Sequence, residues 1–193
     1  ACTALQSRGW EVVINGSVVS EYALSFNGTD ERVEFSTPTP FSGQTLNTFD
    51  CTLSAWAKYD TIAQYEAIIC LGAFDLEIAP TSTTEVGIWV DNAAYGGAVY
   101  APTMGVWNHY VATKSGNTYT LYVNGVQIGQ NDDADNATVG VTSFIGNNSE
   151  SNYLDGDIDE VAIWDEALDA AAVLAVYNAG SPINLNRDKG NYD

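Results

Sequence analysis

Three aspartates near the end of the sequence are spaced by two residues: Asp155, Asp157 and Asp159. On an extended strand this spacing places the three carboxylates on one face. Three like charges in one row repel one another unless water or a cation neutralises them. Carboxylate oxygens are also ligands that a hard dication such as Ca²⁺ prefers. The row therefore predicts a strand that is either solvated or bound to a cation.

Aromatic residues in polar loops are the second chemical signal. Sugar rings stack on exposed aromatic side chains through their C–H faces, while Asn, Asp and Gln bond to the sugar hydroxyls. Most aromatic side chains of a globular domain nevertheless belong to its core. The candidates for glycan binding, which lie in or beside segments rich in Asn, Asp and Gly, are Trp89, Tyr95, Tyr100 and Tyr153.

The histidine and the cysteines suggest no catalytic or zinc centre. His109 has no serine or cysteine nucleophile motif beside it, and one His with three scattered Cys lacks zinc-ligand spacing. We expect His109 to be a structural strand residue. Cys51 and Cys70 flank two successive predicted strands, whose antiparallel pairing would allow a disulfide. Cys2 would then stay a thiol or pair between subunits.

Short strands are the elements that must hold these side chains. Apolar and polar residues alternate through most of the chain, and turn residues such as Asn124–Gly125, a strong hairpin signal, separate the runs. Roughly a dozen such strands predict an all-β fold, an antiparallel two-sheet sandwich of jelly-roll type. The predicted strands are 12–14, 22–26, 32–35, 52–59, 67–71, 74–78, 86–90, 107–114, 118–123, 126–128, 141–145 and 158–164.

One short helix closes the predicted sandwich. Asp169 is a suitable N-cap, residues 170–178 are rich in Ala, and Gly180 occupies the position of a C-terminal cap. We divide the chain into an N-terminal arm, a sandwich and a polar tail or linker, which are residues 1–20, 21–180 and 181–193.

The N-terminal arm carries apolar runs on both sides of Asn15–Gly16, a pattern that predicts a hairpin of its own. An isolated hairpin is marginal in water, so it must dock on the edge of its own sandwich or on that of a neighbour. The alternative is that the arm is the remnant of a preceding segment.

Length and charge limit the function. A chain of 193 residues corresponds to one domain. Six Lys and Arg against 25 Asp and Glu give a net charge of −19, which excludes general nucleic-acid binding and argues against an anionic membrane surface. No run approaches the length of a membrane-spanning segment. The first residues show no signal peptide, so a signal was removed, export took another route, or the chain is cut from a longer one.

An ordered set of segments resembles the laminin G-like, concanavalin A-like domains of bacterial and marine phage surface proteins. The resemblance implies two antiparallel sheets and often a structural calcium ion. It implies no single activity, because such domains bind glycans, bind proteins or serve as spacers. The segments are 23–33, 49–59, 107–112 with 121–125, 144–147 with 154–164, and the closing helix.

The resemblance also implies a set of calcium ligands. In related domains the acidic residue at the start of the D-E-V-x-I-W strand binds calcium, and here that residue is Asp159. An early turn supplies the partners, which would be the carboxylate of Asp30 and an oxygen of Gly28 or Asn27. Calcium is therefore the expected cofactor. The alternative is an ordinary Asx turn beside a solvated acidic strand.

Catalysis is not expected. The sandwich-type glucanases of the superfamily carry E-x-D-x-x-E on one strand, and the best match here runs from Asp157 to Ala162. Ala162 replaces the last glutamate, so the second carboxylate that glycoside hydrolysis requires is missing. Three other aromatic residues match core positions of the family: Trp56, Trp107 and Trp164.

These observations predict a non-catalytic module, extracellular or on a cell surface or virion, for adhesion, glycan binding or decoration and stabilised by calcium. Its partners would be a surface glycan or protein, or copies of itself, without nucleic acid or membrane insertion. The alternative is a self-assembling structural subunit of a filament, fibre or capsid that uses its N-terminal arm.

Overall fold

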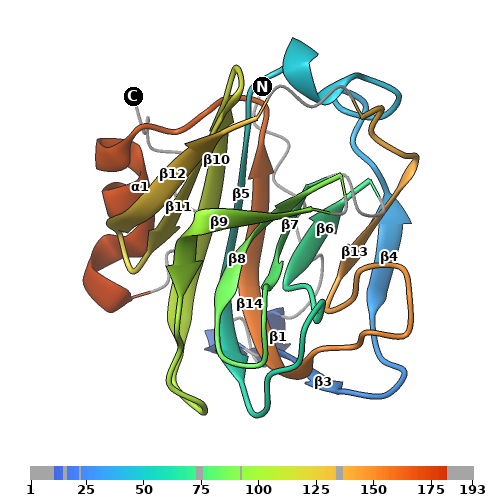
Figure 1. Cartoon of the computed structure of the whole chain (residues 1–193). Helices are drawn as coiled ribbons and strands as arrows, with labels where there is room; N and C mark the ends of the chain where they lie inside the picture. Colours follow the sequence, from blue (N-terminus) through green and yellow to red (C-terminus); the bar gives the residue numbers. More distant parts are fainter. Residues whose placement is uncertain are drawn as a thin grey trace.

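Two antiparallel six-stranded sheets face each other in the computed structural model of the chain (Figure 1). The structure describes residues 11–14, 17–21, 23–72, 76–91, 93–133 and 137–181. The first sheet has the strand order β12-β11-β10-β5-β14-β3, and the second has the order β4-β13-β6-β7-β8-β9. The predicted fold class, an all-β two-sheet sandwich with one short C-terminal helix, is confirmed.

The strands have between three and ten residues. In the first sheet they are β3 (Leu24–Asn27), β5 (Cys51–Tyr59), β10 (Asn108–Ser115), β11 (Thr118–Val123), β12 (Val126–Asp132) and β14 (Asp155–Trp164). In the second sheet they are β4 (Val33–Ser36), β6 (Ile69–Leu71), β7 (Leu76–Pro80), β8 (Val86–Val90), β9 (Ala93–Tyr100) and β13 (Thr142–Ile145).

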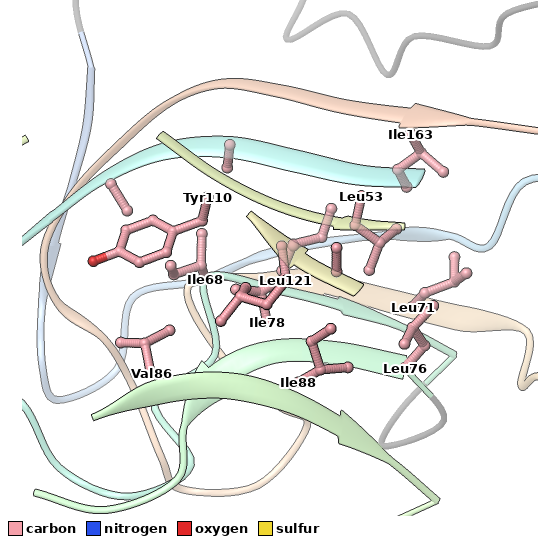
Figure 2. Packing of buried hydrophobic residues seen from close by; sticks show 14 of the residues in the cluster. Leu53, Ile68, Leu71, Leu76, Ile78, Val86, Ile88, Tyr110, Leu121 and Ile163 are labelled. Carbon is pink, nitrogen blue, oxygen red and sulfur yellow. The ribbon is translucent and has the colours of Figure 1, made fainter. Parts of the chain in front are cut away.

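The core lies between the two sheets. Alternation along each strand sends every second side chain inward, so that Leu53 and Ala55 of β5 are buried in the core as their spacing predicts. Figure 2 shows the two layers meeting, with Leu53, Tyr110, Leu121 and Ile163 from the first sheet and Ile78, Val86 and Ile88 from the second. Ser54 and Trp56 of β5 therefore belong to the outer face of the first sheet.

The helix α1 (Ala170–Tyr177) lies on the outer face of the first sheet (Figure 1). The predicted N-cap is confirmed, because the carboxylate of Asp169 accepts a hydrogen bond from the backbone N–H of Ala172 at 2.8 Å. The C-cap of the helix is Asn178, which has left-handed backbone, and φ is also positive at Ala179 and Gly180. A short 3₁₀ turn, η2 (Asn178–Gly180), follows, and a second one, η1 (Leu46–Thr48), precedes β5.

The predicted N-terminal hairpin is also present. Strands β1 (Glu11–Ile14) and β2 (Ser17–Glu21) pair with each other antiparallel. Among the described strands this pair forms a two-stranded sheet of its own, which joins neither of the larger sheets. Most of the predicted tail, residues 182–193, lies outside the described residues.

The predicted disulfide between Cys51 and Cys70 is not formed, because both residues are thiols. The prediction took their strands for neighbours, but β5 belongs to the first sheet and β6 to the second. Cys51 points into the core between the sheets, whereas Cys70 belongs to a cluster with Trp89 and Phe144 on the other face of the second sheet. Burial raises the pKa of the Cys51 thiol to about 12, so it stays protonated at neutral pH.

No helix in the described part of the chain has both the length and the apolar character needed to cross a membrane.

Candidate functional site

Side chains on the outer face of the first sheet form rows that run across its strands. In one row, Lys58 of β5 pairs with Asp157 of β14, which in turn pairs with Ser25 of β3. In the next row, Trp56 of β5 lies between His109 of β10 and Asp159 of β14. Regular alternation in four adjacent strands therefore fixes the positions of all these side chains.

The first row is a chain of polar groups joined by a hydrogen bond and a salt bridge, with an aromatic ring at one end. The ammonium of Lys58 contacts a carboxylate oxygen of Asp157 at 2.5 Å, and Ser25 donates its hydroxyl to the other oxygen at 2.5 Å. On the opposite side, Nζ of Lys58 lies 5.7 Å from the ring centroid of Trp107, the residue before β10. This is within the range of a cation–π contact. We call Trp107, Lys58, Asp157 and Ser25 the open row.

Trp107 is the exposed member of the open row. Its side chain is 37% exposed, whereas Trp56 and Trp164 are buried. The expectation that all three tryptophans are core residues is therefore wrong for Trp107. It holds for the other two, since Trp164 lies beneath α1 and Trp56 lies beneath Tyr177.

The charges of the open row compensate one another. The hydrogen bond to Asp157 raises the pKa of Lys58. Partial burial alone would raise the pKa of Asp157, but the hydrogen bonds from Lys58 and Ser25 outweigh it and lower that pKa. Both groups are therefore charged at neutral pH. They form a fixed pair that still has hydrogen-bonding capacity toward the solvent, since an ammonium carries three donors.

The second row closes the space between the sheet and the end of α1. The ring of Tyr177 stacks on Trp56 with centroids 5.7 Å apart, and on His109 at 6.1 Å. Nε2 of His109 lies 2.8 Å from the hydroxyl of Ser54. Nδ1 of His109 is buried without a hydrogen-bond partner in the described part of the chain. Burial lowers the pKa of His109 to about 4, so the imidazole is neutral, which agrees with its predicted structural role.

A further part of the outer face, on β10, β11 and the end of β14, is covered. The helix α1 and the segment before it bury Val111, Tyr122, Ala162 and Trp164 beneath Leu168, Val173 and Val176. The outer face of the first sheet thus has a half that α1 covers and a half that holds the open row. Tyr177 lies at the boundary between them.

Exposed apolar side chains gather at the same end of the first sheet. The turn Asn124–Gly125 lies beside the start of β10, because Asn124 donates to the side chain of Asn108 at 2.9 Å and to the carbonyl of His109 at 2.9 Å. The loop before β10 contacts the end of β5, since Gly105 donates to the carbonyl of Tyr59. The exposed apolar residues of this loop, this turn and α1 are Met104, Val106, Trp107, Val126 and Leu174.

The early turn that was expected to bind calcium is held by its own hydrogen bonds. The side-chain oxygen of Asn27 accepts the backbone N–H groups of Thr29 at 2.9 Å and Asp30 at 3.2 Å, and its amide nitrogen donates to Asp30. Gly28 donates to the carbonyl of Leu154 at 3.0 Å. This is an Asx turn, the alternative that the sequence left open. The amide oxygen of Asn27 already accepts two bonds, so it does not suit a metal ion.

The carboxylate beside this turn is Asp155 rather than Asp159. Asp155 pairs with Asn27, and a Cβ added at Gly28 would lie 3.0 Å from Cβ of Asp155. Asp159 pairs with Trp56, four residues further along β14, which is roughly 13 Å away. The four predicted ligands Asn27, Gly28, Asp30 and Asp159 therefore do not form one set. In the described part of the chain, no three His, Cys, Asp or Glu side chains are grouped closely enough to hold a metal.

The three aspartates of β14 do share one face, as their spacing predicts, because the residues between them are buried. Each of the three carboxylates has different interaction partners. Asp155 accepts the hydroxyl of Thr61 at 2.7 Å, and Asp157 pairs with Lys58. Burial raises the pKa of Asp159, an effect that a hydrogen bond from the backbone N–H of Glu160 reduces. A lysine of the same sheet thus supplies the neutralising charge for the central aspartate.

Three of the four predicted glycan-binding aromatics have described side chains, and these three do not provide an open platform. Trp89 is only 6% exposed and packs with Tyr65 at 4.8 Å, so its ring faces are not available to a sugar. Tyr100 is half-buried, packs against the core and donates its hydroxyl to Asn108 at 3.3 Å. Tyr153 is half-buried in an isolated bridge with Asn147. The side chain of Tyr95 lies outside the described residues.

Sequence reasoning missed Trp107 because it assigned this residue to the core from the resemblance. Strand alternation contains the missing signal. Trp107 shares its parity with His109 and Val111, which point to the outer face, and Asn108 shares its parity with Tyr110, which points to the core. Residue 107 precedes the part of the face that α1 covers, so its ring is not covered in the same way as that of Trp164.

A family model decides the classification. The model described as the concanavalin A-like lectin/glucanases superfamily, of laminin G-like type, matches residues 27–174. The chain belongs to this superfamily. The match spans the sequence from the end of β3 into α1, and it includes every residue of the open row except Ser25.

Solved structures of this superfamily fold share the architecture at low sequence identity. Domain 4 of AbnA, an extracellular GH43 arabinanase from Geobacillus stearothermophilus solved in complex with arabinotriose, has 19% identity and a TM-score of 0.62 over 80% of this chain and 76% of its own. The native heptameric SAP-like pentraxin from Limulus polyphemus has 20% identity and a TM-score of 0.60 over 79% and 80%. These similarities show the fold alone.

A third relative is a larger molecule. The binding domain of botulinum neurotoxin serotype G has 12% identity and a TM-score of 0.60, and the match covers 85% of this chain but 44% of the toxin domain. No functionally curated protein matches the sequence.

The residues at the position of the glucanase motif do not have the arrangement that hydrolysis by that motif requires. Asp157 and Asp159 occupy the outer face, but Asp157 is paired with Lys58. Ala162, where a third acidic residue would stand, is buried beneath α1. The register of β14 against β5 also shifts between Asp159 and Ala162, so the spacing of the motif is broken.

Proposed function

We propose that this domain is a non-catalytic binding module that binds a glycan at the open row, with Trp107 as the stacking platform. The observation that carries the proposal is the exposed ring of Trp107 beside a fixed chain of hydrogen-bonding groups. A sugar presents an apolar C–H face and a rim of hydroxyls, and this surface offers a partner for each.

Preorganisation favours binding at the open row. The salt bridge and the Ser25 hydroxyl hold Asp157 in place, and the cation–π contact restrains Lys58 beside the Trp107 ring. All of these groups except Trp107 stand on strands. A ligand therefore does not need to order them, which reduces the entropic cost of association.

Similar structures support a binding role without establishing one. The AbnA domain was solved with arabinotriose, and the toxin fragments are binding domains. The absence of a catalytic role is supported by the ion pair at Asp157 and by the burial of the Ala162 position, because hydrolysis needs an acid and a base or nucleophile at the scissile bond. Placement outside the cell, on a cell surface or on a virion is part of the proposal.

Calcium remains a proposal with an amended ligand set. Asp155 takes the place of Asp159 beside the turn that contains Asp30, and backbone oxygens of residues 27–28 complete the candidate donors. An ion here would neutralise the two carboxylates and connect the end of β3 to the start of β14.

The experiment that tests the proposed function compares two truncations on a glycan panel. Trp107→Ala removes the stacking ring, and Leu174→Ala removes an exposed apolar side chain from the same end of the sheet without removing a ring. We expect binding to weaken about tenfold or more in Trp107→Ala, corresponding to the energy of one stacked ring, and to persist in Leu174→Ala. Equal affinity of Trp107→Ala and wild type would refute the proposal.

A second candidate function is assembly through the N-terminal hairpin. The observation that favours it is the β1–β2 pair, which joins neither six-stranded sheet among the described strands. Such a hairpin has unpaired edges that can add to the sheet of a neighbour. Sedimentation of the chain lacking residues 1–20 tests this function, and an unchanged molecular mass and melting curve would contradict it.

A further inference from the structure

Every positive charge in the described part of the chain is already engaged. The chain has six Lys and Arg residues, of which Arg32, Lys58 and Lys114 are among the described residues. Arg32 pairs with Glu34 at 3.2 Å. Lys114 is fully buried and donates its ammonium to the carbonyl of Phe49. Lys58 is the cation of the open row, and Asp157 compensates its charge.

The surroundings of the open row are acidic. Asp159 flanks the row on one side, and Asp155 flanks it on the other. The carbonyl of Asp155 accepts a hydrogen bond from the backbone N–H of Asp60. Lys58 therefore interacts with the charges of Asp157 and Asp60, while Asp155 and Asp159 share the face of β14 with Asp157. The net charge of the whole chain, −19, has the same sign. An anionic ligand would meet repulsion both locally and at long range.

We infer that the ligand of the open row is an uncharged glycan, and that the surface excludes acidic polysaccharides. The inference rests on the proposed function, since it specifies the ligand of that same surface. Aromatic stacking and bonds from sugar hydroxyls to Asp157, Ser25 and Lys58 need no net charge on the ligand. Carboxylated, sulfated or phosphorylated polymers would need an uncompensated cation such as an arginine fork, and the described residues offer none.

Affinity electrophoresis of the full chain tests the inference with a neutral and an acidic panel of polymers, in which hydroxyethyl cellulose and carboxymethyl cellulose share one backbone and differ in charge. The neutral panel contains arabinan, galactan, mannan, xylan and hydroxyethyl cellulose. The acidic panel contains alginate, carrageenan, polygalacturonate and carboxymethyl cellulose. Each gel is run with wild type, Trp107→Ala and the matched control Leu174→Ala. Any neutral polymer that retards the protein is then lightly sulfated and tested again.

We expect retardation by at least one neutral polymer, loss of that retardation in Trp107→Ala, and no retardation by the acidic panel. Sulfation of the neutral ligand should weaken binding about tenfold at low salt, with partial recovery as salt screens the repulsion. Salt should leave binding of the unmodified neutral polymer unchanged.

Two results would overturn the inference in distinguishable ways. Binding that depends on Trp107 but favours an acidic polymer, and weakens with salt, contradicts the inference and leaves the proposed function standing. Absence of binding to every polymer, or binding that Trp107→Ala does not change, removes the proposed function and the inference together.

Discussion

At the scale of single residues, the outer face of the first sheet shows how one environment sets several roles. His109 and Trp56 lie in one row and are buried beneath Tyr177, whereas Trp107 and Lys58 lie one step further along and reach solvent. A step of two residues, from His109 in β10 to Trp107 just before this strand, thus separates a structural aromatic stack from a candidate ligand platform. The stack holds the end of α1 in place, and this end forms the boundary of the open row.

A pH dependence follows from the burial of His109. Its pKa in the folded protein is lowered to about 4, below the ordinary value of 6.5. The unfolded chain therefore takes up a proton as the pH falls below 6.5, while the folded protein does not. The contribution of neutral His109 to stability is fully present above pH 6.5. Below this pH the free energy of unfolding decreases by up to about 1.4 kcal/mol per pH unit, until the pH approaches 4.

The measurement is urea unfolding of wild type and His109→Gln at pH 7 and pH 5. Glutamine keeps a polar group near Ser54 but does not take up a proton. We expect the wild type to lose about 2 kcal/mol more than the variant between these values. The carboxylates are common to both proteins and cancel in the comparison. An equal loss in the two proteins would show that His109 is not held neutral by the fold.

At the scale of elements, the β11–β12 hairpin and α1 depend on each other. Asn124 and Gly125 both have left-handed backbone, with φ of 52° and 74°, as a two-residue hairpin turn requires. A Cβ on Gly125 would lie 2.8 Å from Leu174 and 3.0 Å from Tyr177. The glycine therefore serves the turn and also allows the helix to approach the sheet.

Gly125→Ala and Gly116→Ala separate these two roles. Both glycines have positive φ, but a Cβ on Gly116 would meet nothing within 4 Å. We expect thermal unfolding to show a loss of about 1 kcal/mol for Gly116→Ala from backbone strain alone. The loss for Gly125→Ala should be about 1–2 kcal/mol larger, because Leu174 and Tyr177 must move. Equal losses would mean that α1 does not depend on close contact with this turn.

At the scale of the whole molecule, the sequence predicted the layers better than the surfaces. Alternation along β5 separates Leu53 and Ala55 on one face from Ser54 and Trp56 on the other, as the structure has them, and Asn124–Gly125 and Asp169 mark a turn and a cap correctly. These features depend on neighbours in the chain. The strand β9 was missed because Gly96–Gly97 and its alanines lack the β-branched pattern that identifies strands.

Features that depend on which strands become neighbours could not be predicted from the pattern of residues along the chain. The Cys51–Cys70 pairing assumed one sheet where the chain crosses to the other. The grouping of Asp159 with the Asn27 turn required the register of β14 against β3, which places Asp155 there. Alternation puts Trp107 on the outer face, but its exposure also depends on which part of that face α1 covers. Each of these is a long-range property that periodicity alone does not determine.

The proposed calcium ion would stabilise the whole fold, and this proposal is tested by melting. A ligand that binds only the folded chain stabilises it, by about 2.7 kcal/mol at one hundred times its dissociation constant. We expect EDTA to lower the melting temperature of wild type and Asp159→Ala, because Asp159 is distant from the Asn27 turn. Asp155→Ala should no longer respond to EDTA. If EDTA has no effect on wild type, there is no stabilising calcium ion.

The central claim is that the open row with Trp107 is the binding surface. The indole N–H signals of the five tryptophans in the chain provide a direct measurement by two-dimensional NMR. Addition of a neutral glycan that retards the protein should shift the Trp107 signal, assigned with Trp107→Phe, and leave those of the buried Trp89 and Trp164 in place. A titration that moves the Trp89 signal while the Trp107 signal stays fixed would contradict the account.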